Sequence, residues 1–564
     1  MNNTSLENIH ILTLEESLTV LETLVKAERL EYFKANVLPI LATTQALDKE
    51  LSVKKASKLL NVSAKIIYAS IEEFAKNTTH KSQADMLIEI ATSNILFCDD
   101  LREAHTLIEF EDYNRIIKVN HQDFNIYITG EYYKQTGKAP SSEAIKQAIN
   151  IATATARFDG EKHKLELRVA AYNNAFWYDL ADEKNRAVKI TSDGWQIINK
   201  PPALFRRRNI QDEQVEPVKG REGVWELSRF VNMDEDSFKL FLVYLVTCLI
   251  PEIPHPIPIF HGEKGAAKST TMQVIRRLID PSKRELIALP KNQNELAQQL
   301  SNNYMPCYDN LSYLSQMQSD MLCQASTGGG ISKRTLYSND DDTILKFFCC
   351  PVLNGINVVA NATDLLDRCI IFELKRISED ERKESAKVFT DFESARQDIF
   401  TGLIDALSKA MKIYPTVYLE NKLRMADFTV WGYAVAEALE IGGDTFIKLY
   451  RQNMEKINVA AIEENPLATA IMELMSGKEK IDCTPTELLI KLNAVAEDIK
   501  VNTNSKYWAK DPGSLSKNIM QIKSNLLDAG TKCYTYRLGG NMGRQRRVVL
   551  ESIPNLPSPA STCS

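Results

Sequence analysis

Residues 259–270, Ile-Phe-His-Gly-Glu-Lys-Gly-Ala-Ala-Lys-Ser-Thr, decide the fold of this chain. An apolar run leads into a turn that contains two glycines, and Lys268, Ser269 and Thr270 then open a helix. In such a turn, backbone N–H groups and the helix N-terminus surround a phosphate group. The stretch therefore predicts a strand, a phosphate-binding turn and a helix in an α/β domain. An ordinary strand-to-helix turn is the alternative interpretation.

The turn is close to the P-loop pattern G-x-x-x-x-G-K-[ST], in which the lysine neutralises the β- and γ-phosphates of ATP and the hydroxyl binds Mg²⁺. Lys268 and Ser269 fill these two positions, but Ala267 stands where the pattern has its last glycine. A Cβ there costs about 1 kcal/mol if the residue needs a positive φ, unless Gly265 takes the strained conformation instead. The residues predicted to bind the nucleotide are Gly262, Glu263, Lys264, Gly265, Ala266, Ala267, Lys268, Ser269 and Thr270.

A strand that ends in a carboxylate is expected beside the turn, because Mg²⁺ must also be held from the far side of the phosphates. The apolar segment 304–308 ends in Asp309, which we expect to hold the metal together with Ser269. Asn310 follows, where many ATPases carry a catalytic glutamate. An amide can orient the attacking water but cannot accept its proton, so the sequence predicts slow hydrolysis or a base elsewhere.

A glycine run and a basic pair follow between residues 327 and 342. We expect a β-hairpin with Lys333 and Arg334 on one arm. There they would contact a nucleic-acid backbone or the nucleotide of a neighbouring subunit, and we count Arg334 among the catalytic candidates. A solvated β-turn is the alternative.

Two further polar residues border apolar strands downstream. Asn354 ends one such strand and is expected to sense the γ-phosphate or to position water. Arg368 precedes the next strand, where ring ATPases place an arginine aimed at a nucleotide, often across a subunit interface. For Arg368 a structural ion pair with Asp364 or Asp367 remains an alternative.

In this order the motifs resemble the A, B, B′ and C motifs of superfamily 3 helicases, AAA+-related motors of viruses, phages and plasmids. The chain is more closely similar to a prophage and mobile-element family of primase/helicase-like ATP-binding proteins, over roughly residues 83 to 550. That resemblance implies an ATPase attached to the DNA replication of a mobile element. Ala267 and Asn310 depart from the general helicase pattern. The segments that carry the likeness are 262–270, 308–312, 326–337, 351–356 and 367–368.

The composition is that of a soluble globular protein, with 44% hydrophobic and 25% charged residues. A net charge of -6 provides no general basic field, so DNA would have to bind to local patches. Ten cysteines without a C-x-x-C pair, and an N-terminus without an apolar signal sequence, predict a reduced cytoplasmic protein. The longest apolar run, 240–250, is too short to cross a bilayer and predicts a buried helix.

A chain of 564 residues is expected to form about three to four domains. The predicted fold is multidomain α/β, with a P-loop NTPase core of the AAA+ or superfamily 3 type. Its predicted parts are a helical N-terminal region with a possible helix-turn-helix (1–120), an α+β middle domain with a β-meander (121–220), the ATPase domain (221–420), a helical region with a winged-helix-like domain (421–553) and a disordered tail (554–564).

Two of these parts carry features with open interpretations. Helical periodicity runs over 13–116, and the stretch 53–71 looks like a helix-turn-helix with its turn at 61–63, although a purely structural hairpin fits equally well. Alternating segments between 165 and 198 predict the meander. The arginines at 206–208 that follow are either a phosphate-contacting patch or a solvated loop.

The C-terminal pattern of two helices, near 484–492 and 514–527, followed by two strands joined at 539–543, is what a winged helix requires. The second helix carries lysines on its polar faces, and the hairpin carries arginines that make a local positive field. A solvated hairpin or a protein-docking surface is the alternative. The residues predicted to bind DNA are Lys333, Arg334, Lys517, Lys523, Arg537, Arg544, Arg546 and Arg547.

Together these features predict an ATP- and Mg²⁺-dependent DNA helicase or replication-initiation motor of a phage or mobile element. The expected partners are single-stranded or forked DNA, further copies of the chain in a ring such as a hexamer, and a separate primase, with no membrane. A nucleotide-switched DNA-binding regulator without unwinding activity and an NTPase of anti-phage defence are the alternatives. The residues with expected catalytic roles are Lys268, Asp309, Asn310, Asn354, Arg368 and Arg334.

Overall fold

The computed structural model describes residues 13–553 except 45, 80, 222, 335–341, 356–362, 381, 464, 506 and 539–544. The predicted tail 554–564 and Arg544 lie outside these residues. The chain forms two compact units. The first comprises Met1–Cys98, Glu103–Thr106 and Ile117–Glu161, and the second comprises Asp99–Arg102, Leu107–Ile116 and Lys162–Ser564.

The first unit begins with a helical bundle that contains the expected helical hairpin. Helix α4 (Ala46–Leu60) and helix α5 (Ala64–Thr79) are joined at 61–63, where Asn61 takes the left-handed φ of 55° that a short turn needs. Val53, Ile67 and other apolar side chains form the core between them. The remaining elements of the bundle are α1 (Leu14–Thr23), α2 (Arg29–Tyr32), η1 (Phe33–Val37) and α3 (Leu38–Thr43).

A three-stranded sheet in the order β1-β2-β3 follows, although the sequence predicted only helical periodicity up to residue 116. Strand β2 (Ala104–Glu109) is buried at every position but its last, so its apolar residues do not follow a helical period. A short continuous apolar run fits a buried strand as well as a helix segment, which is why periodicity misassigned it. The neighbouring elements are α6 (Gln83–Thr92), β1 (Ile95–Cys98), β3 (Asn114–Lys118), α7 (Gln122–Thr136) and α8 (Ser142–Phe158).

The second unit contains the predicted meander, a four-stranded antiparallel sheet in the order β4-β5-β6-β7. The expected turn at 173–174 joins the first two strands, and both of its asparagines have positive φ. Gly194 begins the last strand with a φ of 127°. The strands are β4 (Val169–Tyr172), β5 (Ala175–Asp179), β6 (Ala187–Thr191) and β7 (Gly194–Ile198).

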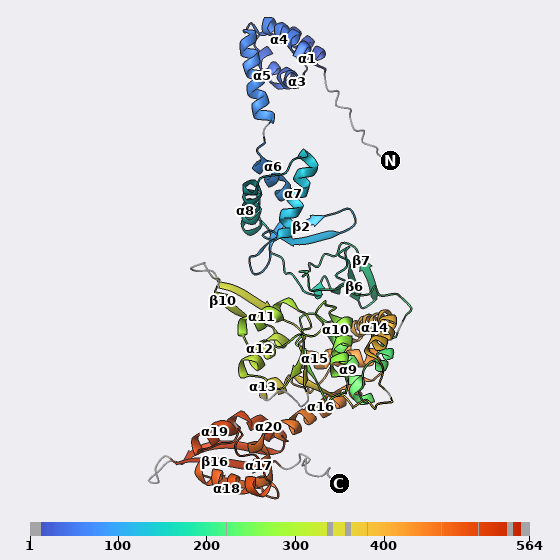
Figure 1. The fold of residues 1–564 in the computed structure, drawn as a ribbon, viewed down its shortest axis with the longest axis vertical. Helices are drawn as coiled ribbons and strands as arrows, with labels where there is room; N and C mark the ends of the chain where they lie inside the picture. The colour runs from blue at the N-terminus through green and yellow to red at the C-terminus, as the bar shows by residue number, and fades with distance from the viewer. Residues whose placement is uncertain are drawn as a thin grey trace. The chain divides into compact units, whose positions relative to one another are not determined.

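The second unit also contains a parallel sheet in the order β13-β8-β12-β9. Figure 1 labels the helices α10, α11 and α12 of the same region. Strand β12 lies between β8 and β9, so the residues that follow these three strands meet at one edge of the sheet. The strands are β8 (Ile257–His261), β9 (Cys307–Leu311), β12 (Val352–Gly355) and β13 (Cys369–Glu373), and the helices among them are α10 (Lys268–Ile279), α11 (Gln293–Asn302), α12 (Gln316–Thr327) and α13 (Thr363–Leu366).

Helix α9 (Glu235–Thr247) confirms the buried helix expected from the apolar run at 240–250. Its Phe241 ring packs edge-on against Phe260 of β8 and Phe372 of β13, with ring centroids 5.9 and 5.4 Å apart. No helix in the described ranges is long and apolar enough to span a bilayer. The elements around α9 are η2 (Val224–Arg229), α14 (Ser385–Ile413), η3 (Tyr414–Thr416), α15 (Ala426–Ala438) and α16 (Gly443–Glu463).

The chain ends in a domain with its own apolar core. Its three-stranded sheet has the order β14-β16-β15, and the elements follow one another as the winged-helix prediction requires. The long second helix of that prediction is interrupted at Ile522, where one helix ends and the next begins. The elements are α17 (Pro466–Met475), β14 (Lys480–Cys483), α18 (Pro485–Asp498), α19 (Pro512–Gln521), α20 (Lys523–Asp528), β15 (Thr531–Leu538) and β16 (Gln545–Ser552).

Candidate functional site

The turn between β8 and α10 has a backbone with positive φ at three positions, which favours glycine. Gly262 and Gly265 have φ of 141° and 89°, and Ala267, directly before α10, has φ 59°. Both Gly265 and Ala267 therefore have positive φ, although the sequence suggested that Gly265 would adopt it in place of Ala267. Ala267 bears the cost of about 1 kcal/mol that a Cβ adds in this region.

The lysine that opens α10 folds back over this turn. The Lys268 ammonium donates hydrogen bonds to the carbonyl oxygens of Gly262 at 2.8 Å and Glu263 at 3.0 Å. Its charge is thus held above the turn, next to backbone N–H groups at the start of the helix. A lysine in this place can neutralise an anion bound by those N–H groups.

Three polar side chains from three elements converge beside the turn. The Ser269 hydroxyl lies 3.1 Å from each carboxylate oxygen of Asp309, and the Asn354 amide donates a hydrogen bond to the same carboxylate. Asp309 lies on β9 and Asn354 on β12, so the strand order brings them together. A hydroxyl and a carboxylate are hard oxygen ligands, and their spacing fits a shared Mg²⁺ ion.

Asn310 lies beside this cluster but offers it a backbone group. Its N–H donates to Asp309 Oδ1 at 2.9 Å and lies 3.4 Å from Asn354 Oδ1. The residue is exposed and has a left-handed φ of 60°, which asparagine tolerates better than most residues. The amide of Asn310 cannot accept the proton of the attacking water. Its expected role in positioning that water stays a prediction.

His261 ends β8 directly before the turn and was not among the predicted site residues. Burial lowers the pKa of its imidazole and the nearby Lys268 lowers it further, while Glu373 opposes them. Glu373 is the residue paired with His261 across β13 and β8. His261 is therefore neutral at neutral pH, when it can accept a proton. Only the strand register reveals it, since a lone histidine carries no sequence signal.

The predicted hairpin is present as β10 (Gly329–Arg334) and β11 (Asp342–Phe347). Lys333 pairs with Thr343 and Arg334 with Asp342 in the antiparallel register. The side chains of Lys333 and Arg334 lie outside the described residues. Their proposed contacts with DNA or with a neighbouring nucleotide therefore stay predictions.

Arg368 is not part of the cluster around the turn. It precedes Cys369, which pairs with Ile257 at the beginning of β8, whereas the turn follows the end of β8. Four residues of strand separate the two places by about 13 Å. Its guanidinium donates to the backbone oxygen of Asp364 at 2.5 Å. Arg368 therefore cannot complete the site of its own chain. Its two remaining interpretations are a role at the site of a neighbouring subunit and a structural role within its own domain.

The arginines of the C-terminal hairpin differ in their environments. Arg537 and Arg546 are exposed and directly opposite each other in the β15–β16 register. Two like charges in this position repel each other, and a bound phosphate would relieve that repulsion. Arg547 instead donates to the Asp482 carboxylate and to its backbone oxygen, each at 2.7 Å. Hydrogen bonds from Arg547 and Tyr536 lower the pKa of the Asp482 carboxyl.

The two predicted DNA-binding lysines of this domain are also not equivalent. Lys517 is exposed on α19, as a backbone contact requires, whereas Lys523 is half-buried at the start of α20. Among the arginines at 206–208, Arg207 pairs with Asp179 and bonds the backbone oxygen of Asp182. Arg207 therefore supports the meander and does not serve as a free phosphate contact.

Two protein-family models match the part of the chain that contains the turn and the polar cluster. Residues 223–490 match the family model described as actinomycete integrative conjugative element replication protein, and residues 467–561 match that of the AICE RepA C-terminal domain. The matched part of the chain is that of a mobile-element replication protein. It contains the parallel sheet, the turn, the polar cluster and the C-terminal domain.

Among solved structures, the replication protein is similar to ligand-free structures of the C-terminal region of NrS-1. Two structures of that region in its A form each match with 12% identity and a TM-score of 0.38, and another matches with 11% identity and a TM-score of 0.37. Each covers 84% of this chain and 100% of the other. No curated protein matches. The assignment of residues 223–561 rests on the family matches and not on these low scores.

Sequence reasoning missed two features of the replication protein, one beside the turn and one at the other end of α10. The segment after β13 runs against the turn, and the Arg376 guanidinium there lies 3.7 Å from the Glu263 carboxylate. Arg382 in the same segment lies next to Gly265. The basic residues at 375–376 and 382–383 are visible in the sequence. Their relevance depends on β13 lying beside β8, which no local pattern reveals.

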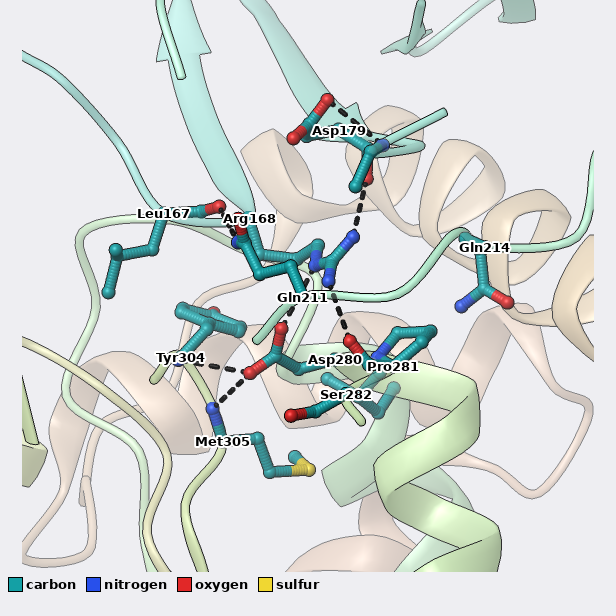
Figure 2. Close-up of polar contacts among 12 residues, drawn as sticks. Leu167, Arg168, Asp179, Gln211, Gln214, Asp280, Pro281, Ser282, Tyr304 and Met305 are labelled. Atoms are coloured by element: carbon teal, nitrogen blue, oxygen red, sulfur yellow. Dashed lines mark hydrogen bonds and ion pairs between the residues drawn. The ribbon is translucent and has the colours of Figure 1, made fainter. Parts of the chain in front are cut away.

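The second missed feature is a buried ion-pair network at the far end of α10 (Figure 2). The Asp280 carboxylate accepts from the Arg168 guanidinium at 3.0 Å and pairs with Arg276 at 2.9 Å. It also accepts from the backbone N–H groups of Tyr304 and Met305, at 3.0 Å each, just before β9. Asp280 thereby ties the helix that begins with Lys268 to the strand that carries Asp309.

Proposed function

We propose that this replication protein is an ATP- and Mg²⁺-dependent motor that unwinds or remodels DNA for the replication of its mobile element. The observation that carries the proposal is the Ser269 hydroxyl 3.1 Å from the Asp309 carboxylate, beside a glycine-bearing turn that Lys268 covers. Nucleotide-dependent motors need this combination, since it places metal ligands and a phosphate-binding turn together.

The residues of the chain have distinct roles in this proposal. The turn and Lys268 bind the phosphates, Ser269 and Asp309 would hold Mg²⁺, and Asn354 orients the Asp309 carboxylate and the attacking water. Mg²⁺, when bound, supplies charge neutralisation to the phosphates. Arg368 would act at the site of a neighbouring copy, because it lies at the opposite edge of its own sheet. The proposal therefore includes a ring of copies, such as a hexamer.

Strand displacement on a forked DNA tests the motor proposal. We expect ATP hydrolysis that DNA stimulates, displacement of the annealed strand only with ATP and Mg²⁺, and a mass of several subunits under the same conditions. These can be measured with a labelled fork, a phosphate-release assay and light scattering. A protein that hydrolyses ATP but never displaces the strand, in any oligomeric state, would contradict a helicase.

One observation favours a second candidate, a DNA-binding regulator that nucleotide switches slowly. Asn310 replaces a carboxylate at the position after Asp309, and its side chain has no described role in the polar cluster. A switch needs tight nucleotide binding but little turnover. The same assays separate the two candidates, because DNA affinity that depends on nucleotide, without displacement, would support the regulator.

We further propose that the C-terminal domain binds the DNA backbone through Arg537 and Arg546 in the manner of a winged helix. Replacing both with alanine should weaken DNA binding and lower the slope of log K against log salt by about 2, since each arginine neutralises about one phosphate. Fluorescence anisotropy at several salt concentrations measures this. Arg547→Ala is the matched control, and we expect it chiefly to destabilise the domain because its guanidinium is bound to Asp482.

An unchanged salt slope in the double variant would refute the assignment of this hairpin to DNA. It would instead favour the protein-docking alternative for the same surface.

A further inference from the structure

The segment that follows β13 forms a wall of the proposed nucleotide site. The Leu374 N–H donates to the His261 oxygen at 2.9 Å, and a Cβ built on Gly262 would lie 2.4 Å from the Leu374 oxygen. Asn232 holds the next residue, because its amide donates to the Lys375 oxygen at 2.5 Å. The beginning of this segment is therefore fixed against the first residue of the turn, and Gly262 is needed for that approach.

Further along the segment, one arginine reaches the middle of the turn. The Arg382 Nη2 atom lies 3.4 Å from the position that a Cβ on Gly265 would take. Gly265 is exposed and has no side chain of its own, so the guanidinium lies next to bare backbone. Arg376 differs, because its guanidinium is directed to the Glu263 carboxylate at 3.7 Å. In the described part of the chain no carboxylate forms an ion pair with Arg382.

We propose that Arg382 binds the phosphate chain of the nucleotide in its own subunit, an inference that rests on the proposed function of the turn. A guanidinium presents planar donors that bind phosphate oxygens in pairs, and it stays charged at every working pH. With Lys268 on one side of the turn and Arg382 beside Gly265, two cations serve the same phosphates. Arg368, at the other edge of the sheet, is left for a neighbouring copy.

Nucleotide affinity tests this proposal directly. The dissociation constants of fluorescent ATP and ADP analogues, with Mg²⁺ present, are measured by anisotropy for the full-length wild type and the variants Arg382→Ala, Arg382→Lys and Arg376→Ala. We expect Arg382→Ala to weaken both nucleotides about tenfold, as the loss of a charged hydrogen bond does. Arg382→Lys should recover part of the affinity, and Arg376→Ala should change it by about twofold or less, as for an exposed charge.

Competition with inorganic tripolyphosphate separates a phosphate contact from a structural effect. This probe shares the phosphates of ATP but has no base or sugar, so its inhibition constant should rise in Arg382→Ala by the same factor as the nucleotide constants. Thermal unfolding of the variant should match that of the wild type, since Arg382 is exposed.

Three results would overturn the inference: wild-type affinity in Arg382→Ala, an equal loss in Arg376→Ala, or unchanged tripolyphosphate competition. A failure of the underlying site is distinguishable from these, because Lys268→Ala would then also leave nucleotide binding unchanged. Loss in Lys268→Ala with none in Arg382→Ala would overturn only the role of Arg382.

Discussion

In the proposed motor, replacing Lys268 with alanine should lower the rate of ATP hydrolysis by about 100-fold or more, because it would remove a preorganised charge from the place where negative charge develops on the phosphates. The Lys268 ammonium is already held over the turn by the Gly262 and Glu263 oxygens. Phosphate release measured at saturating ATP and DNA tests this expectation. Retained hydrolysis would rule out the assignment of 262–270 as a nucleotide site.

The matched control for this variant is Lys283→Ala, which removes the same charge from an exposed position just beyond α10. DNA binding provides a second control. The C-terminal domain has its own core, so we expect both variants to bind DNA as the wild type does when nucleotide is absent. Loss of DNA binding in Lys268→Ala alone would show that the two regions are coupled.

Replacing Asp280 with asparagine should destabilise the second unit by about 3–5 kcal/mol, the usual cost of removing one partner from a buried ion pair. Arg168 and Arg276 would keep their charges without the carboxylate, and both side chains are at most 2% exposed. Urea unfolding followed by tryptophan fluorescence measures the change. Glu226→Gln, in the exposed pair of Glu226 with Arg229, is the matched control and should change stability by about 1 kcal/mol or less.

The stabilisation from Asp280 should also depend on pH. Burial disfavours its charged form, but Arg276, Arg168 and the Met305 N–H together outweigh burial, so the pKa of the carboxyl is lowered in the folded protein. The contribution is therefore fully present above the ordinary aspartate pKa of about 3.9, and it disappears as the pH falls through the lower folded value. The difference between wild type and Asp280→Asn should shrink below about pH 4. A difference independent of pH would contradict the role of charge.

Much of the core was predictable because its signals are local. The turn at 262–267, the strands ending in Asp309 and Asn354, and the buried helix over 240–250 follow from apolar runs and from the residues that end them. The helical hairpin at 61–63 and the meander follow from period and turn chemistry in the same way. Where local signals were ambiguous, as for the short apolar run of β2, the prediction of helix was wrong.

Other features depended on which strands are neighbours. The sequence placed Arg368 before an apolar strand but could not show that this strand pairs with β8, which puts Arg368 at the edge opposite the turn. The sequence predicted that Arg547 binds DNA together with the other arginines of the C-terminal hairpin, but its guanidinium donates a hydrogen bond to the Asp482 carboxylate. Asp280 carried no motif at all, and its partner Arg168 is 112 residues away in sequence. Contacts between residues so far apart in sequence produce no periodic pattern in the sequence.

The sequence by itself determined the chemistry available at the turn, because it supplies the ammonium of Lys268, the hydroxyl of Ser269 and the carboxylate of Asp309, and the short apolar strands before them fix where such residues emerge. The tertiary structure decided which of the cations share that site. Placing β12 between β8 and β9 brought Asn354 to Asp309, and placing β13 beside β8 brought Arg382 to the turn and Arg368 away from it. Strand order does this because the ends of parallel strands meet at one edge, whatever their distance in sequence.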